Sequence, residues 1–250
     1  MSAVREESDH RLAGRLATEA GELLIRLRGG SLPAAELRRA GDEASHRFLA
    51  EALARARPGD AILSEEGRDD RSRLAADRVW IVDPLDGTRE FGEPGRADWA
   101  VHVALWQAGD LVAGALALPA VARTLTTGTP APPPPPPATP IRIVVSRTRP
   151  PDFVAGVAAD LGAELCELGS AGAKIAAVIE GRAEAYLHGG GQYEWDSAAP
   201  VAVARAAGLH ASRLDGSPLR YNQPDPWLPD LLVCLPALAG RLLDAVAARA

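Results

Sequence analysis

A short apolar run that ends in a turn rich in carboxylates constrains this chain more than any other feature. Residues 79–82 are apolar, and residues 83–88 (DPLDGT) follow them directly. An apolar run bounded by Pro and Gly predicts a buried strand that ends at the turn. Pro84 favours an extended Asp83, and the glycine lets the chain bend sharply before Thr88. The turn therefore brings two carboxylates, a carbonyl and a hydroxyl together at one strand end.

Acidic residues elsewhere decide how this turn is interpreted. An isolated D-x-x-D-G motif is more often a plain acidic turn, in which Asp83 caps backbone N–H groups and Asp86 is solvated. Here, however, Glu65 and Glu66 also follow an apolar segment, and Asp196 opens a helical pattern far downstream. Two carboxylates about 4 Å apart repel by roughly 4 kcal/mol at an effective dielectric constant of about 20. A fold that gathers these acids needs a cation, and such oxygen ligands suit Mg²⁺.

Together, these motifs resemble the signature of a known family. The hexapeptide at 83–88, Glu65-Glu66 and Trp195-Asp196 are similar to motifs of the inositol monophosphatase-like, metal-dependent, lithium-sensitive phosphatases. Within that superfamily, residues 83–91 (DPLDGTREF) and 191–196 (GQYEWD) resemble the 3′(2′),5′-bisphosphate nucleotidases of the CysQ type. The resemblance runs from about residue 12 to about residue 234. It implies a layered αβαβα sandwich of the sugar-phosphatase type, with an N-terminal α+β half built on an antiparallel sheet and a C-terminal α/β half.

The first part of the chain combines helices with a hairpin. Helical spacing of apolar residues predicts helices at 9–28 and about 42–56, and we expect residues 31–39 to be irregular. A short strand at 61–63 is expected to lead to Glu65. Two further strands, joined by a tight turn, are expected at 99–106 and 111–118.

In the second part strands alternate with helices, which predicts an open α/β sheet. Pro200 is tolerated in the first turn of a helix, so we expect the third helix of this part to begin close to Asp196. The strands are expected at 141–145, 164–168, 183–188 and 231–235, and the helices at 151–161, 170–180, 196–207 and 237–248.

An uninterrupted proline run at 132–137 separates the two parts. Such a run could be a ligand of an SH3-type domain, although a single polyproline stretch is more often a stiff, exposed spacer. We therefore expect an N-terminal metal-binding half at 1–128, a Pro-rich linker at 129–140 and a C-terminal substrate-binding half at 141–250.

Composition restricts the partners and the location. A formal net charge of −6 with no basic block argues against binding of polymeric nucleic acid. No apolar span is long enough to cross a bilayer, and the polar residues 1–11 are unlike a signal peptide, so we expect a cytoplasmic protein without membrane contact. Cys166 and Cys234 are expected to be buried free thiols. His102 alternates with apolar neighbours, so we expect a paired core or interface residue rather than a zinc ligand.

Hydrolysis of a phosphate ester requires neutralised phosphoryl oxygens, an oriented water and help for the departing alkoxide. Two or three Mg²⁺ ions roughly 3.5–4 Å apart can supply all three. Asp83 would bridge two ions, Glu65 and the Leu85 carbonyl would complete the first, and Asp86 and Asp196 would hold the second. Glu66 is expected to lie outside the ligand set.

The resemblance implies that Asp42 pairs with Thr88 to orient the attacking water, and that Glu65 belongs to the catalytic group. For Asp42, the alternative is a cap at the N-terminus of the helix at 42–56. The residues expected to bind substrate are Asp86, Gly87, Thr88, Ser170, Lys174 and Asp196. Ser170 could also be a plain helix cap, and Lys174 could be solvated. Substrate choice is expected from the rim around Lys174 and residues 188–195.

The resemblance implies a particular reaction, whereas the residues alone indicate a metal-assisted phosphomonoesterase. The reaction is removal of the 3′-phosphate from adenosine 3′,5′-bisphosphate, with 3′-phosphoadenylyl sulfate as a second substrate and a role in sulfur assimilation. An inositol monophosphatase or fructose-1,6-bisphosphatase with the same metal core is the first alternative. A noncatalytic phosphate-binding scaffold that uses the proline run is the second. Lithium inhibition is implied by the resemblance, and homodimers are common among the relatives.

Overall fold

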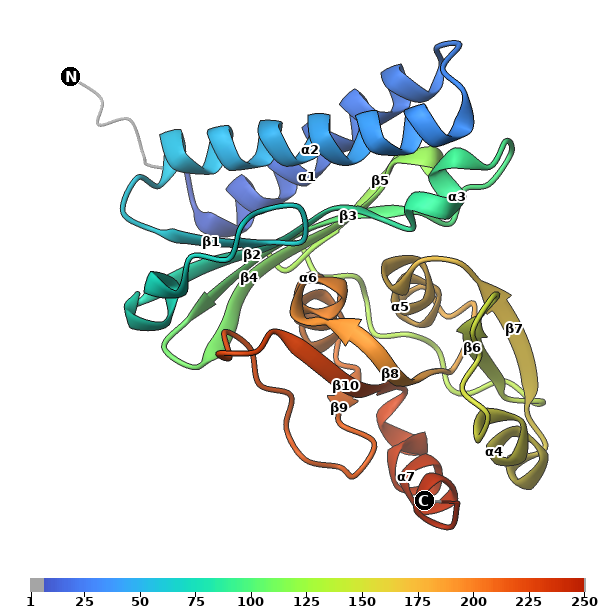
Figure 1. Ribbon diagram of the computed structural model, residues 1–250. Helices are drawn as coiled ribbons and strands as arrows, with labels where there is room; N and C mark the ends of the chain where they lie inside the picture. The colour runs from blue at the N-terminus through green and yellow to red at the C-terminus, as the bar shows by residue number, and fades with distance from the viewer. Residues whose placement is uncertain (1–6, 250) are drawn as a thin grey trace.

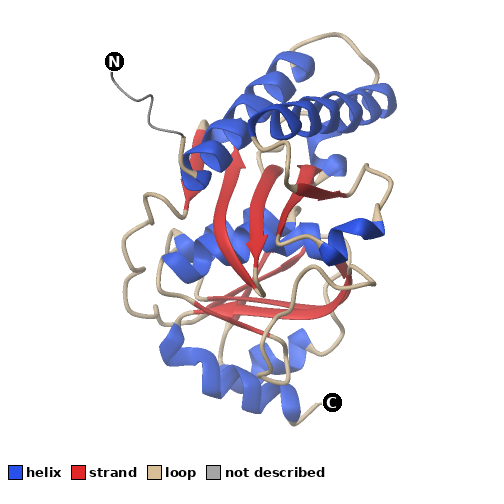
Figure 2. Cartoon of the chain, turned by 90° about the vertical axis from the view of Figure 1, so that its left-hand side faces the viewer, coloured by secondary structure: helices blue, strands red, loops and turns tan. Residues whose placement is uncertain are grey.

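A computed structural model describes residues 7–249 of the chain as five stacked layers of helix and sheet (Figure 1). Two long N-terminal helices cover the first sheet, two helices lie between the sheets, and two short helices cover the outer face of the second sheet. Figure 2 shows the same layers from the side. Much of the segment for which we expected no signal peptide lies outside the described residues. Among the described residues, no helix has both the length and the apolar character needed to cross a bilayer.

The first sheet has the strand order β1-β2-β3-β4-β5. β1 and β2 are parallel and the other pairs are antiparallel, so the predicted hairpin is confirmed as β3–β4. The strands are β1 (Ala61–Ser64), β2 (Arg78–Asp86), β3 (Ala100–Gln107), β4 (Asp110–Leu118) and β5 (Arg123–Thr126). The helices of this half are α1 (Asp9–Arg28), α2 (Ala34–Ala56) and α3 (Thr88–Gly92), with 3₁₀ turns at Arg71–Ala75 and Pro119–Val121.

Helix α2 begins at Ala34 rather than near Asp42, so the expected irregular segment at 31–39 is wrong. Pro33 precedes the first turn, where its missing N–H costs nothing, and Ala-Ala-Glu-Leu-Arg-Arg then favours a helix. Gly41 lies inside the helix because the fold needs a small residue there. A Cβ at Gly41 would approach Cε1 of Phe91 to 2.7 Å.

The predicted buried strand is confirmed as β2, and it continues into the acidic turn. Asp83 lies opposite His102 of β3, and the register then shifts before Asp86 pairs with Ala100. Gly87 follows with a φ of 85°, a left-handed conformation that favours glycine. This bulge and turn present the oxygen atoms of the motif at the C-terminal end of β2.

The second sheet has the order β7-β6-β8-β10-β9 and is mixed. β6 is parallel to β7 and β8, whereas β10 is antiparallel to β8 and β9. The four predicted strands are present, but β5 and β9 were not predicted because each is very short. The strands are β6 (Arg142–Ser146), β7 (Glu164–Leu168), β8 (Ala185–Tyr193), β9 (His210–Ser212) and β10 (Trp227–Cys234). The helices are α4 (Val154–Leu161), α5 (Ala171–Ile179), α6 (Glu194–Ala206) and α7 (Ala239–Ala247), with a 3₁₀ turn at Pro236–Leu238.

Helix α6 contains Pro200 in its interior, so confining this proline to the first turn was wrong. The helix begins two residues before Asp196, at Glu194. A capping box holds this start, in which the Asp196 side chain accepts the backbone N–H of Tyr193 at 2.6 Å. That bond stabilises the first turn and offsets the hydrogen bond that Pro200 cannot donate.

One buried cluster joins the two halves. It includes Ile81 and Ala104 of the first sheet and Val144 and Leu232 of the second, with α5 and α6 residues between them. Because the halves share this core, packing and not only the connecting segment sets their relative position. The proline run is largely exposed and touches the body of the protein where Pro135 packs against Gly181.

Candidate active site

The turn after β2 is held in shape by its own hydrogen bonds. The Leu85 N–H donates to Oδ1 of Asp83 at 3.0 Å. The Thr88 hydroxyl lies 3.1 Å from the Leu85 carbonyl oxygen and 3.2 Å from Oδ1 of Asp42, so it can donate to either. The Ser45 hydroxyl donates to the Pro84 carbonyl at 2.7 Å and fixes the turn against α2.

Asp42 therefore lies within α2 and not at its N-terminus, which excludes the capping role that we considered for it. Burial raises the pKa of Asp42 to about 6, with the charge of Glu66 adding to the effect and the Thr88 hydrogen bond opposing it. The structure thus places Asp42 against Thr88.

Three carboxylates from distant parts of the chain converge beside this turn. Asp83 and Asp86 come from β2 and Asp196 from α6, and one oxygen of each lies within 4.8 Å of the others. Oδ2 of Asp83 is buried and has no hydrogen-bond partner among the described residues. A buried carboxylate oxygen without a partner is costly, so this atom calls for a positive ligand.

The raised pKa values of these acids also indicate that the cluster lacks positive charge. Burial, followed by the charges of Glu65 and Asp86, raises the pKa of Asp83 well above its usual range. Burial and the charge of Asp86 raise the pKa of Asp196 to about 7. Burial, followed by the charge of Asp196, likewise raises the pKa of Glu65 to about 7, although Glu65 lies outside the group of carboxylate oxygens within 4.8 Å of one another.

Asp86 differs from its neighbours because donors surround it. Its carboxylate accepts the N–H of Gly172 at 2.6 Å and that of Ala171 at 3.2 Å, and Nε2 of His102 lies 3.2 Å from Oδ2. Burial alone would raise the pKa of Asp86, but His102 and the backbone donors lower it. The two N–H groups at the start of α5, where we expected phosphate to bind, are thus occupied by Asp86.

His102 is the paired core residue that the sequence predicted, and its partners are site residues. It is fully buried, its Nδ1 lies 3.0 Å from the Trp195 carbonyl, and Asp86 raises its pKa against the opposing effect of burial. His102 was not among the site residues predicted from the sequence. Its position opposite Asp83 on the neighbouring strand could have indicated the contact, but only once the register was known.

Asp98, also absent from the predicted site, positions the loop before α5. Its Oδ2 accepts the N–H of Gly169 at 2.6 Å, and its carbonyl accepts the N–H of Ser170 at 3.1 Å. The Ser170 hydroxyl accepts the N–H of Ala173 at 2.8 Å, as a helix cap does. The start of α5 is therefore rigid and faces Asp86.

A cavity of about 290 Å³ opens next to these groups. It is lined by all of the residues predicted to bind substrate: Asp86, Gly87, Thr88, Ser170, Lys174 and Asp196. A larger cavity of about 520 Å³ lies along the other side of α5 and contains none of the predicted site residues. Site chemistry therefore locates the functional cavity, whereas volume does not.

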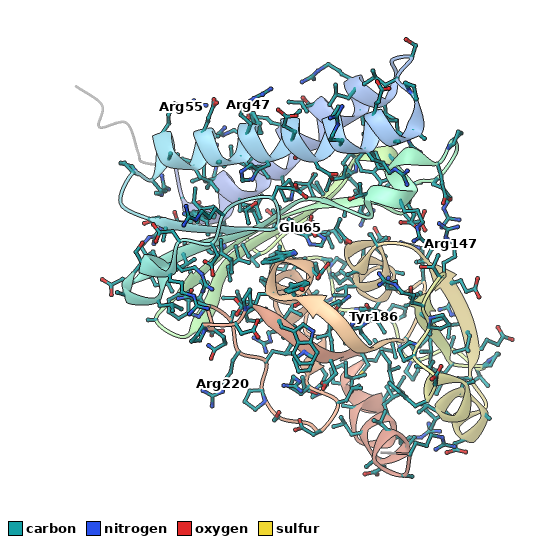
Figure 3. The ribbon with its side chains drawn as sticks, viewed as in Figure 1. Arg47, Arg55, Glu65, Arg147, Tyr186 and Arg220 are labelled. Carbon is teal, nitrogen blue, oxygen red and sulfur yellow. The ribbon has the colours of Figure 1, made fainter. Side chains whose placement is uncertain are left out.

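Lys174 is buried rather than solvated. Its ammonium donates to the Gly169 carbonyl and lies 5.3 Å from the centre of the Tyr186 ring. Burial lowers the pKa of Lys174. The same wall of the cavity carries His188 and Gln192, which belong to the rim expected at 188–195, and Tyr186 and Arg149, which were not predicted. Figure 3 shows Glu65 beside the first sheet and Tyr186 beside the second.

The residues present fit a hard divalent cation. The cluster offers carboxylate oxygens of Asp83, Asp86 and Asp196, which are ligands of the type that Mg²⁺ prefers. Glu65, whose pKa is raised by Asp196, and the Leu85 carbonyl, which lies between Asp83 and Asp86 in the turn, are further oxygen donors of the same type. The unpartnered oxygen of Asp83 and the raised pKa values of three of the acids are what repelling carboxylates without a cation should show.

The fold and this acidic cavity define a class of protein. The model of the inositol monophosphatase family matches residues 8–131 and 138–248. The chain belongs to the inositol monophosphatase family, whose members are metal-dependent phosphatases. The family and the layered sandwich predicted from the motifs are confirmed.

The chain is also similar to particular proteins. The "3'-phosphoadenosine 5'-phosphate phosphatase" of Mycobacterium leprae is 51% identical over 264 residues, which cover 96% of this chain and 94% of the relative. The protein of the same name in Mycobacterium tuberculosis is 53% identical over 240 residues, covering 92% and 90%. The crystal structure of CysQ from Bacteroides thetaiotaomicron superposes with a TM-score of 0.80 at 28% identity and covers 93% and 98%. These names agree with the CysQ-type branch.

Proposed function

We propose that this protein removes the 3′-phosphate from adenosine 3′,5′-bisphosphate, giving AMP and phosphate, and that 3′-phosphoadenylyl sulfate is a second substrate. One observation carries the proposal: a single cavity is lined by Asp86 and Asp196 and by the basic residues Lys174 and Arg149. A substrate with two anionic groups on one ribose suits such a cavity. The two mycobacterial relatives described above, which are more than 50% identical and are named as phosphatases of 3'-phosphoadenosine 5'-phosphate, support the same substrate.

We further propose that two or three Mg²⁺ ions bind to Glu65, Asp83, the Leu85 carbonyl, Asp86 and Asp196. When bound there, Mg²⁺ would neutralise phosphoryl oxygens and make water a better nucleophile. The Leu85 carbonyl has two lone pairs, so it can accept the Thr88 hydrogen bond and still serve as a ligand. The tight hydrogen bonds to Asp86 preorganise its carboxylate before any ion arrives.

Thr88 and Asp42 are the side chains that would accept the proton of the attacking water. With its hydrogen directed to Asp42, the Thr88 hydroxyl keeps its lone pairs for a hydrogen of the attacking water. That contact orients the water, and the water's proton can pass to Thr88 as the Thr88 proton moves to Asp42. A general base of this kind contributes about 10²- to 10⁴-fold to a rate.

Residues of the second half bind and orient the substrate. Lys174 is fixed over Tyr186 and places a positive charge inside the cavity. The Gln192 side-chain amide donates to the Tyr186 hydroxyl at 2.9 Å and holds that ring in place. A nucleoside between these groups would direct its 3′-phosphate to the acidic end.

A phosphate-release panel tests the proposal. Purified protein is assayed with and without Mg²⁺ on adenosine 3′,5′-bisphosphate, inositol 1-phosphate and fructose 1,6-bisphosphate. We expect release that requires Mg²⁺, is inhibited by lithium and has the highest kcat/KM on the nucleotide. A higher kcat/KM on inositol 1-phosphate or fructose 1,6-bisphosphate would transfer the assignment to that substrate class. No release from any substrate would favour the noncatalytic scaffold. A homodimer and a cytoplasmic location stay predictions from the sequence.

A further inference from the structure

The mouth of the cavity carries two arginines with no acidic partner. Arg149 lies in the loop after β6, and Arg89 lies in α3 directly after Thr88. Both line the cavity, and both are exposed. Within residues 7–249, neither guanidinium makes an ion pair or a hydrogen bond. Arg149 does donate a hydrogen bond to Oγ of Ser146 at 3.2 Å, but through its backbone N–H.

Arg147, which lies close by, differs from these two arginines because it has acidic partners. Arg147, two residues before Arg149, pairs with Glu90 at 2.6 Å and with Glu93 at 3.0 Å, so its charge is neutralised. Glu90 is buried and directly follows Arg89. Glu90 and Glu93, which are close to Arg89 in sequence, are therefore already paired with Arg147, and Asp152, three residues after Arg149, makes no ion pair with it within the described residues.

The inner wall of the cavity carries Lys174, whose ammonium makes no ion pair among the described residues. It donates to the neutral Gly169 carbonyl and lies over the Tyr186 ring, while the charges of Asp86 and Glu90 act on it from farther away. Nε2 of His188 is buried and has no hydrogen-bond partner among the described residues. Burial, followed by the charge of Lys174, lowers the pKa of His188 to about 4, so this ring is neutral and can donate to or accept from a ligand.

We propose that Arg149 and Arg89, with Lys174 behind them, form a second anion site that binds the 5′-phosphate of the substrate while the 3′-phosphate occupies the acidic end. This inference rests on the proposed function, because it assigns the group that is not hydrolysed. An arginine fork binds a phosphate through two parallel hydrogen bonds, which a lysine cannot reproduce. Because Arg89 and Arg149 come from different halves of the chain, a bound phosphate would bridge the mouth.

Paired substrates that differ only in the second anion test the site. The ratio of kcat/KM for adenosine 3′,5′-bisphosphate to that for adenosine 3′-phosphate is measured for the wild type and the variants. We expect Arg149→Ala to lower this ratio about 10- to 100-fold, as the loss of a charged hydrogen bond does. Arg89→Ala should lower it as well, and Arg149→Lys should lower it less than Arg149→Ala.

Arg220→Ala is the matched control. Arg220 is exposed and makes no ion pair within the described residues, and Figure 3 shows it far to the left of Arg147. We expect its ratio to equal that of the wild type. A ratio that Arg149→Ala leaves at the wild-type value, or an equal loss on both substrates, would overturn the proposal.

A binding experiment separates this site from the proposed reaction. Titration calorimetry compares AMP with adenosine in the absence of Mg²⁺, when the acidic end repels phosphate. We expect AMP to bind more tightly than adenosine, and the difference to disappear in Arg149→Ala. If the wild type hydrolyses neither nucleotide but shows this difference, the proposed reaction is wrong and the anion site stands. Equal binding of AMP and adenosine to the wild type shows that the anion site is wrong.

Discussion

The two ends of the catalytic cavity are built in opposite ways. At the acidic end, β2 and its turn present Asp83 and Asp86, which are buried and held by backbone N–H groups. At the basic end, α5, β8 and the loop after β6 present Lys174, His188 and Arg149. The first part of the chain thus supplies most of the attraction for cations, and the second part, together with Arg89 of the first, supplies the attraction for anions.

Asp196 crosses this division. It belongs to the second part of the chain, yet it lies with the acids because α6 is packed between the two sheets. Neither part can therefore assemble the cation site alone. The comparison indicates that changes at the acidic end should abolish turnover of every substrate, whereas changes at the basic end should alter substrate preference or charge balance.

The sharpest test of the acidic end is Asp83→Asn. This change keeps the shape of the side chain but removes the charge, so we expect kcat to fall at least about 1,000-fold, because a metal ion's charge stabilisation is worth several kcal/mol. Thermal unfolding gives a second measurement. Bound Mg²⁺ should stabilise the wild type by about 2.7 kcal/mol at 100 times its Kd. The variant should lose this gain.

Without Mg²⁺, Asp83→Asn should be at least as stable as the wild type, since it removes a repelled carboxylate from a buried position. Asp77→Asn is the control, because Asp77 is an exposed acid one residue before the same strand. Wild-type turnover in Asp83→Asn, or an equal loss in Asp77→Asn, contradicts the role of Asp83 as a metal ligand.

A smaller loss is expected for Thr88→Val, which removes the hydroxyl between Asp42 and the Leu85 carbonyl. If this hydroxyl orients the water as proposed, kcat should fall about 100-fold or more, with little change in KM. Steady-state kinetics at saturating Mg²⁺ measure both. Thr88→Ser keeps the hydroxyl and should recover most of the rate. Equal rates in Thr88→Val and the wild type would remove Thr88 from the mechanism.

At the basic end, the expected effect is on stability and depends on pH. The pKa of His188 is about 4 in the folded protein because of burial and the charge of Lys174, against the ordinary histidine pKa of 6.5. The unfolded state therefore binds more protons between these values, and the stability due to His188 is lost as pH falls through this window. The loss is about 2 kcal/mol at pH 5 relative to pH 7.

Urea unfolding at pH 5 and pH 7 measures this loss. In His188→Gln the side chain does not titrate, so the fall in stability between the two pH values should be about 2 kcal/mol smaller than in the wild type. Parallel behaviour of the wild type and the variant would show that the His188 ring is not kept neutral, and the basic end would then be less positive than the comparison requires.

How much of this could be predicted depends on whether the signal was local. The turn after β2 carries its acids, its proline and its glycine within six residues, so its strand, its bend and its ligand types could be inferred from sequence. The start of the helix around Asp42 could not, because Asp42 was expected as a cap, whereas its carboxylate accepts from Thr88 of another segment. Local pattern cannot separate a carboxylate that caps a helix from one that faces a distant residue.

The residues of the site that were missed share a different property. His102 contacts Asp86 through the register of β2 and β3, and Asp98 contacts Gly169 across 71 residues of chain. Arg149 stands out because Arg147 forms an ion pair with Glu90, whereas Arg149 forms none within the described residues. The role of each residue depends on which other residues lie beside it in the fold and not on its own position in the sequence. Only the three-dimensional arrangement could therefore show it.

The smallest effect is expected where the two parts of the chain are joined. The proline run at 132–137 falls in the gap between the matched family segments, is largely exposed and does not line the cavity. If the shared core fixes the two ends of the cavity, replacing the run by a Gly/Ser hexapeptide should change kcat/KM by no more than about twofold, the size of an ordinary surface change. The stability should fall slightly, since prolines restrict the unfolded chain.

Steady-state kinetics and urea unfolding measure both quantities, and Pro135→Ala, which alters the contact with Gly181, serves as the single-residue comparison. A large rise in KM in the hexapeptide variant but not in Pro135→Ala would mean that the tether, rather than the core, positions the basic end against the acids.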